Sequence, residues 1–148
     1  MNSNSPVISS PKIGAVIIVT SGNKILLGKR KNSYKSGFYG TPAGGIESLE
    51  KVIDGAKREL FEETGLKVET LDYVGVIRDI DDGYDFIHFA FLCKDYKGEP
   101  RLMEPNRCES WEWIDSDKIP ENTLIGHKAA IEMFLNPDSP SIRDVSSI

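Results

Sequence analysis

The sequence predicts an α/β (α+β) domain in which two helices pack against a mixed β-sheet as a sandwich. Two hydrophobic periods alternate along the chain in the order two strands, helix, three strands, helix, and this order is typical of a sheet with helices on its faces. The 148 residues, 39% of them hydrophobic, suffice for one core without disulfides or structural metals. We therefore expect one domain at residues 11–136, between a disordered tail at residues 1–10 and an untethered C-terminal tail at residues 137–148.

The first two strands are predicted at residues 13–19 and 24–29. β-branched residues dominate the first segment, and the intervening Ser21, Gly22 and Asn23 are typical turn formers, so the pair is expected to form a hairpin. A loop rich in glycine and aromatic residues follows, at residues 36–45.

A helix is predicted from about residue 49 to residue 64. Its apolar residues recur at intervals of three and four and so share one face, which we expect to be buried. They are Leu49, Val52, Ile53, Ala56 and Leu60. Gly65 follows where a left-handed C-cap is needed, and Leu66 can fold back onto the last turn.

Three further strands and a second helix complete the predicted domain. Residues 71–78 and 84–93 are predicted strands joined through Asp81, Asp82 and Gly83, and residues 110–114 form a shorter one. The strand at 84–93 is apolar on both sides, which indicates burial on both faces. A final helix is expected at about residues 121–135, with Pro137 beyond its end.

Charge and composition narrow the class of function. The chain has 18 basic and 23 acidic residues, a net charge of −5, and no cluster of basic residues of the kind that binds a nucleic acid polymer. No apolar run approaches the roughly 18 residues of a membrane span, and the N-terminus lacks a secretory signal pattern. Cys93 and Cys108 lack zinc-site spacing and are expected to be reduced thiols. We expect a cytoplasmic protein with neither a membrane nor a nucleic acid polymer as partner.

Three glutamates lie at the end of the first predicted helix, where helix electrostatics disfavour them. Glu59, Glu62 and Glu63 share one face at a spacing of about 5–6 Å, beside carbonyls that make this helix end partially negative. Arg58 can pair with one carboxylate but cannot neutralise three. Mg²⁺ can, because it shares its coordination sphere between carboxylates, waters and substrate phosphates. The charge pattern alone favours a solvated acidic helix end over a metal site.

The spacing around these glutamates resembles the Nudix box, GX5EX7REUXEEXGU with U aliphatic. The match covers residues 44–66, and its fixed positions are Gly44, Glu50, Arg58, Glu59, Leu60, Glu62, Glu63, Gly65 and Leu66. At average residue usage an accidental match is on the order of 10⁻⁹ per starting position, so the pattern favours a site over a solvated helix end. Many such boxes have glycine before the first glutamate, where this chain has Leu49.

The resemblance implies the Nudix fold, a mixed-sheet α/β/α sandwich, and hydrolysis of nucleoside diphosphates linked to another group. The implied ligands of Mg²⁺, or of Mn²⁺ in its place, are the carboxylates of Glu59, Glu62 and Glu63 and the backbone carbonyl near Ala43. Glu50 and Arg58 are implied to orient these carboxylates by ion pairing. Glu59 is either a metal ligand or the base that takes the proton from the attacking water.

A fourth acidic ligand in this fold often comes from a loop outside the box. Glu104 is our candidate because it precedes the predicted strand at 110–114, and Glu109 and Glu112 compete with it. A plain surface charge is the alternative interpretation of Glu104.

The candidates for substrate binding lie outside the box and are Phe38, Tyr39, His88 and Trp111. Each has a structural alternative, because aromatic side chains beside turns and on strands commonly pack in a core, and a histidine in a buried strand is commonly a hydrogen-bonded core residue. His127 on the final helix is expected at the surface.

Residues 103–113 and 118–120 resemble the tail of MutT-like members, which act on (deoxy)nucleoside triphosphates. This resemblance implies hydrolysis to a monophosphate and pyrophosphate, damaged or non-standard nucleotides included. The segment Pro-Ala-Gly-Gly at 42–45 also occurs in sugar-nucleotide hydrolases, so ADP-ribose stays open, as do dinucleoside polyphosphates and prenyl diphosphates. A non-catalytic nucleotide sensor is a further alternative, although such modules usually lose box carboxylates. A monomer and a homodimer are both compatible with the sequence.

Overall fold

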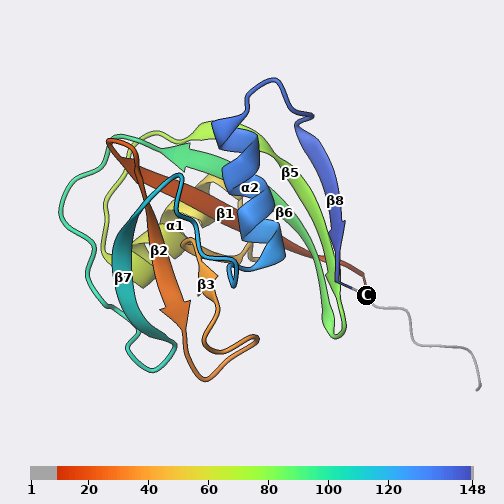
Figure 1. Ribbon diagram of the computed structural model, residues 1–148, viewed down its shortest axis with the longest axis horizontal. Helices are drawn as coiled ribbons and strands as arrows, with labels where there is room; N and C mark the ends of the chain where they lie inside the picture. The colour runs from red at the N-terminus through yellow and green to blue at the C-terminus, as the bar shows by residue number, and fades with distance from the viewer. Residues whose placement is uncertain (1–9, 148) are drawn as a thin grey trace, which may run out of the picture.

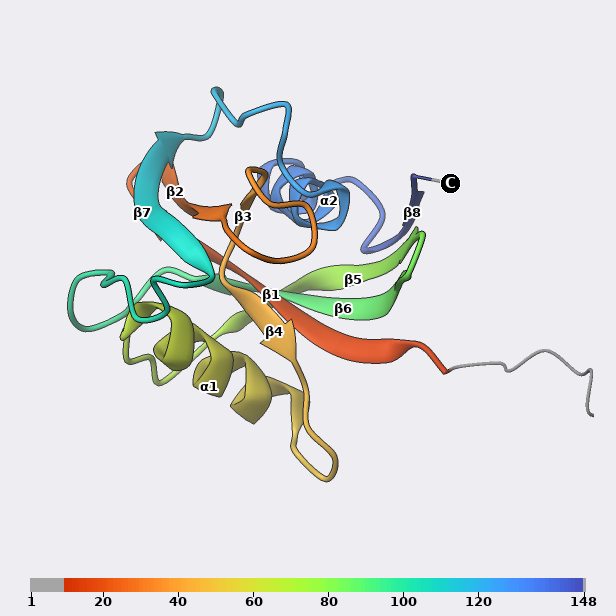
Figure 2. The same cartoon turned by 90° about the horizontal axis from the view of Figure 1, so that it is seen from below.

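The computed structural model describes residues 10–147, which form a mixed sheet with a helix on each face (Figure 1). The strands β1 (Lys12–Ser21), β2 (Lys24–Arg30), β3 (Tyr39–Gly40) and β4 (Ala43–Gly45) precede helix α1 (Val52–Thr64). The strands β5 (Asp72–Asp81), β6 (Tyr84–Cys93) and β7 (Cys108–Asp115) follow, and then helix α2 (Ile125–Leu135) and strand β8 (Ile142–Ser146). In Figure 2 α1 lies below the sheet and α2 above it, which confirms the predicted fold class.

The sheet branches because β1 and β2 pair only beside their turn. Thr20 pairs with Ile25 and Ser21 with Lys24. Beyond these rungs β1 runs parallel to β6 and antiparallel to β4, whereas β2 pairs antiparallel with β3 and β7. The predicted hairpin is confirmed at its turn, but its strands splay into two halves of the sheet.

Strand β1 separates two hydrophobic cores. Side chains alternate between the faces of a strand, so Ala15, Ile17 and Val19 join the core under α1, and Val16 and Ile18 join the core under α2. All five residues are fully buried. The continuous β-branched run in the sequence therefore reflects a strand that is covered on both faces.

Helix α1 begins at Val52, later than the sequence predicts, and ends as expected. Ile53 is 38% exposed, so the prediction that it lies on the buried face is wrong. The same prediction is wrong for Leu49, which is fully exposed with a φ of 65°. The loop after β4 needs a left-handed residue here, a conformation that glycine adopts without strain. At the other end Gly65 has a φ of 75°, and its N–H donates to the Phe61 carbonyl at 2.8 Å. Leu66 is buried, and together these features confirm the predicted C-cap.

Helix α2 also begins later than predicted, at Ile125 instead of near residue 121. The residues before it pair with β3: Tyr39 donates to the Asn122 carbonyl at 2.9 Å and accepts from the Leu124 N–H at 2.8 Å. This pairing places His127 inside the protein, where it is 2% exposed and accepts a hydrogen bond from the Thr41 N–H at 3.0 Å. The prediction of a surface histidine at 127 is wrong for this reason.

The C-terminal segment differs from the expected tail at 137–148. Residues 142–146 form β8, which pairs in parallel with β5 between Val76 and Ile80. The expectation is therefore wrong for this segment, because the outer edge of β5 presents backbone N–H and C=O groups that a short strand satisfies. The expected tail at residues 1–10 lies, except for Ser10, outside the described residues. No helix within residues 10–147 is long and apolar enough to cross a membrane.

Candidate active site

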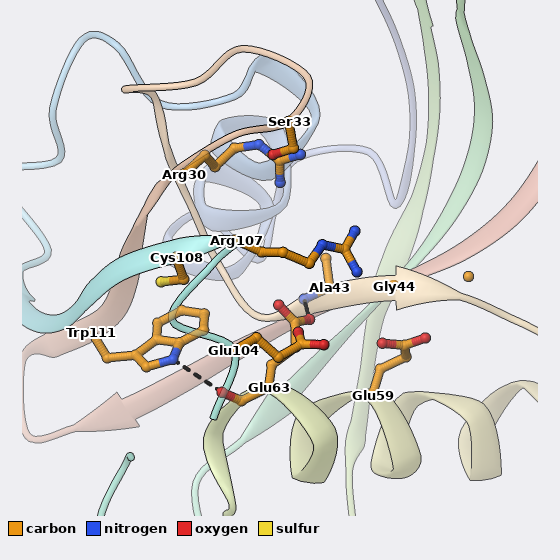
Figure 3. A pocket seen from close by; sticks show the side chains of 11 residues that line it. Arg30, Ser33, Ala43, Gly44, Glu59, Glu63, Glu104, Arg107, Cys108 and Trp111 are labelled. Atoms are coloured by element: carbon orange, nitrogen blue, oxygen red, sulfur yellow. Dashed lines mark hydrogen bonds between the residues drawn. The ribbon is translucent and has the colours of Figure 1, made fainter. Parts of the chain in front are cut away.

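A polar cavity of about 280 Å³ lies between α1 and β4 on one side and the ends of β2 and β7 on the other (Figure 3). Its carboxylates are Glu59, Glu63 and Glu104, and its guanidinium groups are Arg30 and Arg107. The remaining lining residues are Ser33, Ala43, Gly44, Gly45, Cys108 and Trp111. Residues of the predicted box thus meet residues that are distant from it in the sequence.

Arg58 organises the acidic residues of the box from the side of α1. Its guanidinium donates to both carboxylate oxygens of Glu50, at 2.8 and 3.0 Å, and to the Gly45 carbonyl at 2.9 Å. It also donates to Glu59 at 3.0 Å and to Glu62 at 3.2 Å. These hydrogen bonds with Arg58 lower the pKa of Glu50 to about 2. Arg58 therefore ties the loop after β4 to the helix and fixes the direction of two glutamates.

Glu63 is held at the base of the cavity by two contacts from other strands. The Ala43 N–H donates to its carboxylate at 2.8 Å, and the indole N–H of Trp111 donates to its backbone carbonyl at 3.1 Å. The second contact satisfies one of the carbonyls left unpaired in the last turn of a helix. Burial raises the pKa of Glu63 to about 8, so the carboxylate lies where a negative charge is costly without a counter-charge.

Glu59 approaches the backbone of β4 so closely that the facing residue must be glycine. A Cβ atom added to Gly44 would lie 2.5 Å from the Glu59 Cγ and closer still to its carboxyl group. Burial raises the pKa of Glu59, against the opposing effect of Arg58. The first glycine of the box therefore makes room for a carboxylate that points into the cavity.

The acidic groups present fit a divalent cation. Three carboxylates share the cavity, and burial raises the pKa of both Glu59 and Glu63, which indicates that positive charge is in short supply there. Glu62 is turned outward to Arg58, and within residues 10–147 no three acidic, histidine or cysteine side chains stand in a ready-made ligand cage. The hard oxygen donors are those that Mg²⁺ or Mn²⁺ takes.

Of the three acids considered outside the box, Glu104 is the one that lines the cavity. Its negative charge contributes to the raised pKa values of Glu59 and Glu63. Glu109 instead pairs with Lys29 at 3.6 Å, with both side chains largely exposed. The loop before β7 thus brings one acid to the pocket.

Of the four candidates for substrate binding, Trp111 lines the cavity and the other three do not. Tyr39 is bonded through its backbone to residues 122–124, and the Phe38 ring lies 5.3 Å from the Lys35 ammonium. His88 is 2% exposed, stacks on Phe86 at 5.0 Å and shares a hydrogen bond with the Tyr84 hydroxyl at 3.0 Å. Burial lowers its pKa to about 4, so His88 is a neutral core histidine. This agrees with the alternative interpretation of His88 as a hydrogen-bonded core residue.

Two arginines and a cysteine of the cavity were not among the predicted site residues. Arg30 ends β2 and pairs with Cys108 at the start of β7, next to Arg107. The bulge in β2 between Gly28 and Arg30 is the kind of irregularity that re-aims a side chain near a site. No local pattern in the sequence predicts this meeting, because it depends on the register of two strands far apart along the chain.

Comparisons with known proteins agree with the site. The model of the NUDIX domain matches residues 10–134. The chain is 31% identical over 116 residues to the oxidized purine nucleoside triphosphate hydrolase of Danio rerio, covering 74% of this chain and 69% of that protein. It is 31% identical to the NAD-capped RNA hydrolase NudC of Pseudomonas putida, but covers 40% of that protein's length. The solved structure of the MutT NUDIX hydrolase from Burkholderia pseudomallei superposes with a TM-score of 0.81 at 31% identity, covering 84% of this chain and 98% of that one.

Proposed function

This chain belongs to the NUDIX domain family and is a pyrophosphohydrolase of small nucleotide substrates, and from that membership we propose that it converts (deoxy)nucleoside triphosphates to monophosphates and pyrophosphate with Mg²⁺. The observation that carries the proposal is the cavity in which Glu59, Glu63 and Glu104 meet. The similarity to an oxidized purine nucleoside triphosphate hydrolase supports the choice of a triphosphate and keeps oxidised purine bases among the substrates to be tried.

The reaction consumes one water for each triphosphate. A bond forms between the water oxygen and one of the two phosphorus atoms of the α–β bridge. The P–O bond from that phosphorus to the bridging oxygen breaks with its electron pair on the departing group, so that a monophosphate and pyrophosphate result, and a proton is released at neutral pH. The phosphate oxygens repel the nucleophile, so the transition state needs positive charge and an activated water. A bound Mg²⁺ supplies both.

The residues of the chain have distinct roles in this proposal. The carboxylates of Glu59, Glu62, Glu63 and Glu104, with the Ala43 carbonyl, would hold the ion. Glu59 either serves as one of these ligands or takes the proton from the attacking water, and its raised pKa suits a proton acceptor. Arg58 orients Glu59 and is itself anchored by Glu50. Trp111 forms a wall of the cavity, and we assign it a contact with the substrate.

The proposal is tested by incubating the protein with a nucleotide panel, with and without Mg²⁺, and measuring pyrophosphate and phosphate. Release of pyrophosphate from triphosphates, dependent on Mg²⁺, is the expected result. Formation of AMP and ribose phosphate from ADP-ribose alone would replace the triphosphate by a sugar nucleotide, and cleavage of dinucleoside polyphosphates alone would replace it by a dinucleotide. Binding without turnover of any compound would identify a sensor.

A further inference from the structure

The two guanidinium groups of the cavity lie opposite its carboxylates. Figure 3 shows Arg30 and Arg107 entering from the side of β2 and β7, while Glu59 and Glu63 rise from α1. Among the described residues neither arginine forms an ion pair, although acidic side chains line the same space. Arg30 lines the cavity and uses its Nε to donate to the Tyr34 carbonyl at 2.7 Å, which leaves its terminal N–H groups without a partner among the described residues.

The backbone holds these two arginines as neighbours. Arg30 pairs in register with Cys108, the residue after Arg107, and the Lys31 N–H donates to the Arg107 carbonyl at 3.0 Å. Two like charges so placed repel each other, and their mutual repulsion contributes, after burial, to a lowered pKa of Arg30. A pair of adjacent, unneutralised guanidinium groups is suited to a ligand with adjacent negative charges, because each planar fork donates two hydrogen bonds to one phosphate.

We propose that Arg107, together with Arg30, binds the terminal two phosphates of the substrate and therefore the pyrophosphate product. This inference rests on the proposed triphosphate substrate, and it adds that the two arginines are the residues that select a triphosphate. A terminal phosphate carries more negative charge than a phosphate esterified on both sides, as in ADP-ribose. The guanidinium pair consequently favours a substrate that ends in free phosphates, while the carboxylates opposite would hold the cation.

Arg107 is the residue to change. Its side chain is exposed and makes no hydrogen bond to another described residue, so its replacement should not destabilise the fold. The test compares Arg107→Ala and Arg107→Lys with the control Arg143→Ala. Arg143 lies on β8, outside the cavity, and pairs with Glu132 of α2 at 2.7 Å. Three quantities are measured: KM and kcat, each for a triphosphate and for ADP-ribose, and the Kd of inorganic pyrophosphate by calorimetry in Mg²⁺.

We expect Arg107→Ala to raise KM for the triphosphate and Kd for pyrophosphate by about 10- to 100-fold, the effect of losing a charge-assisted hydrogen-bonded pair. kcat stays within about threefold, because the interaction is formed with bound substrate and transition state alike. Arg107→Lys recovers part of the affinity, and KM for ADP-ribose and all values of Arg143→Ala stay unchanged.

An Arg107→Ala variant that binds pyrophosphate as tightly as Arg143→Ala overturns the inference. An equal loss of affinity for ADP-ribose and for the triphosphate overturns the selectivity that it assigns to the arginines. Failure of the proposed function has a different signature, since the unmodified protein would then release no pyrophosphate from any triphosphate. The pyrophosphate Kd tests the arginines in that case too.

Discussion

Replacing Gly44 with alanine is expected to disable the enzyme without unfolding it. The added methyl would lie 2.5 Å from the Glu59 Cγ and closer still to the carboxyl carbon of Glu59, whereas ordinary contact begins at 3.4 Å, so the carboxyl group must retreat by more than about 1 Å. The φ of Gly44 is not in the left-handed region, and alanine therefore adds no backbone strain. The perturbation acts on one carboxylate.

The magnitude follows from the precision that the reaction needs. A displacement of about 1 Å of a catalytic group costs on the order of 10²-fold in rate, which corresponds to about 2.7 kcal/mol of transition-state stabilisation. Stability falls less, by about 1 kcal/mol, because the principal loss is one hydrogen bond between Arg58 and Glu59. We thus expect kcat to fall about 100-fold while the urea midpoint shifts only slightly.

The assay is pyrophosphate release at saturating substrate and Mg²⁺, with urea unfolding as the measure of stability. Gly45→Ala is the matched control, since a Cβ at this next residue of β4 meets nothing within 4 Å. If both alanine variants turn over at the same rate, the contact between Gly44 and Glu59 has no part in catalysis. A variant at position 44 that is largely unfolded would likewise contradict the reasoning, which confines the clash to one side chain.

Three further predictions concern the same cavity. Glu59→Gln should lower kcat by about 10²- to 10⁴-fold at saturating Mg²⁺, and unchanged turnover would remove Glu59 from both of its proposed roles. Because Glu63 has a pKa near 8 in the folded protein and near 4.5 when unfolded, unfolding releases a proton in this range, and stability decreases as pH rises. The melting temperature of the metal-free protein should therefore fall between pH 6.5 and 8, above the range in which His88 titrates. Glu63→Gln should flatten this dependence, and Mg²⁺ should oppose it. A flat profile in the unmodified protein would show that Glu63 is ionised throughout. Trp111→Phe removes the donor to the Glu63 carbonyl and should cost about 1 kcal/mol in urea unfolding, and an unchanged midpoint would mean that solvent replaces this hydrogen bond.

The residues that local geometry controls were predictable. The helical repeat alone puts Glu59, Glu62 and Glu63 at one end of α1, and the requirement for a left-handed residue explains Gly65 as its C-cap. A run of β-branched residues predicted strand β1, and apolar residues on both sides of residues 84–93 predicted a buried strand β6. The apolar residues of both strands face both cores.

Local pattern did not separate the roles of neighbouring glutamates. Glu62 and Glu63 are adjacent in the sequence, yet one is turned out to Arg58 and the other inward to the Ala43 N–H. The difference arises because β4 pairs with β1 and so lies beside the helix. A contact between residues 20 positions apart cannot be inferred from the period of the helix that contains one of them.

The remaining features came from strand pairing over long distances. The register of β2 against β7 brings Arg30 beside Arg107, and the pairing of residues 122–124 with Tyr39 buries His127. The glutamates of the helix in the box are related by the repeat of 3.6 residues per turn, so a short stretch of sequence is enough to predict their relative positions. The wall of the cavity opposite the box depends on which strands pair and in what register. Many residues spread over the whole chain determine that pairing together.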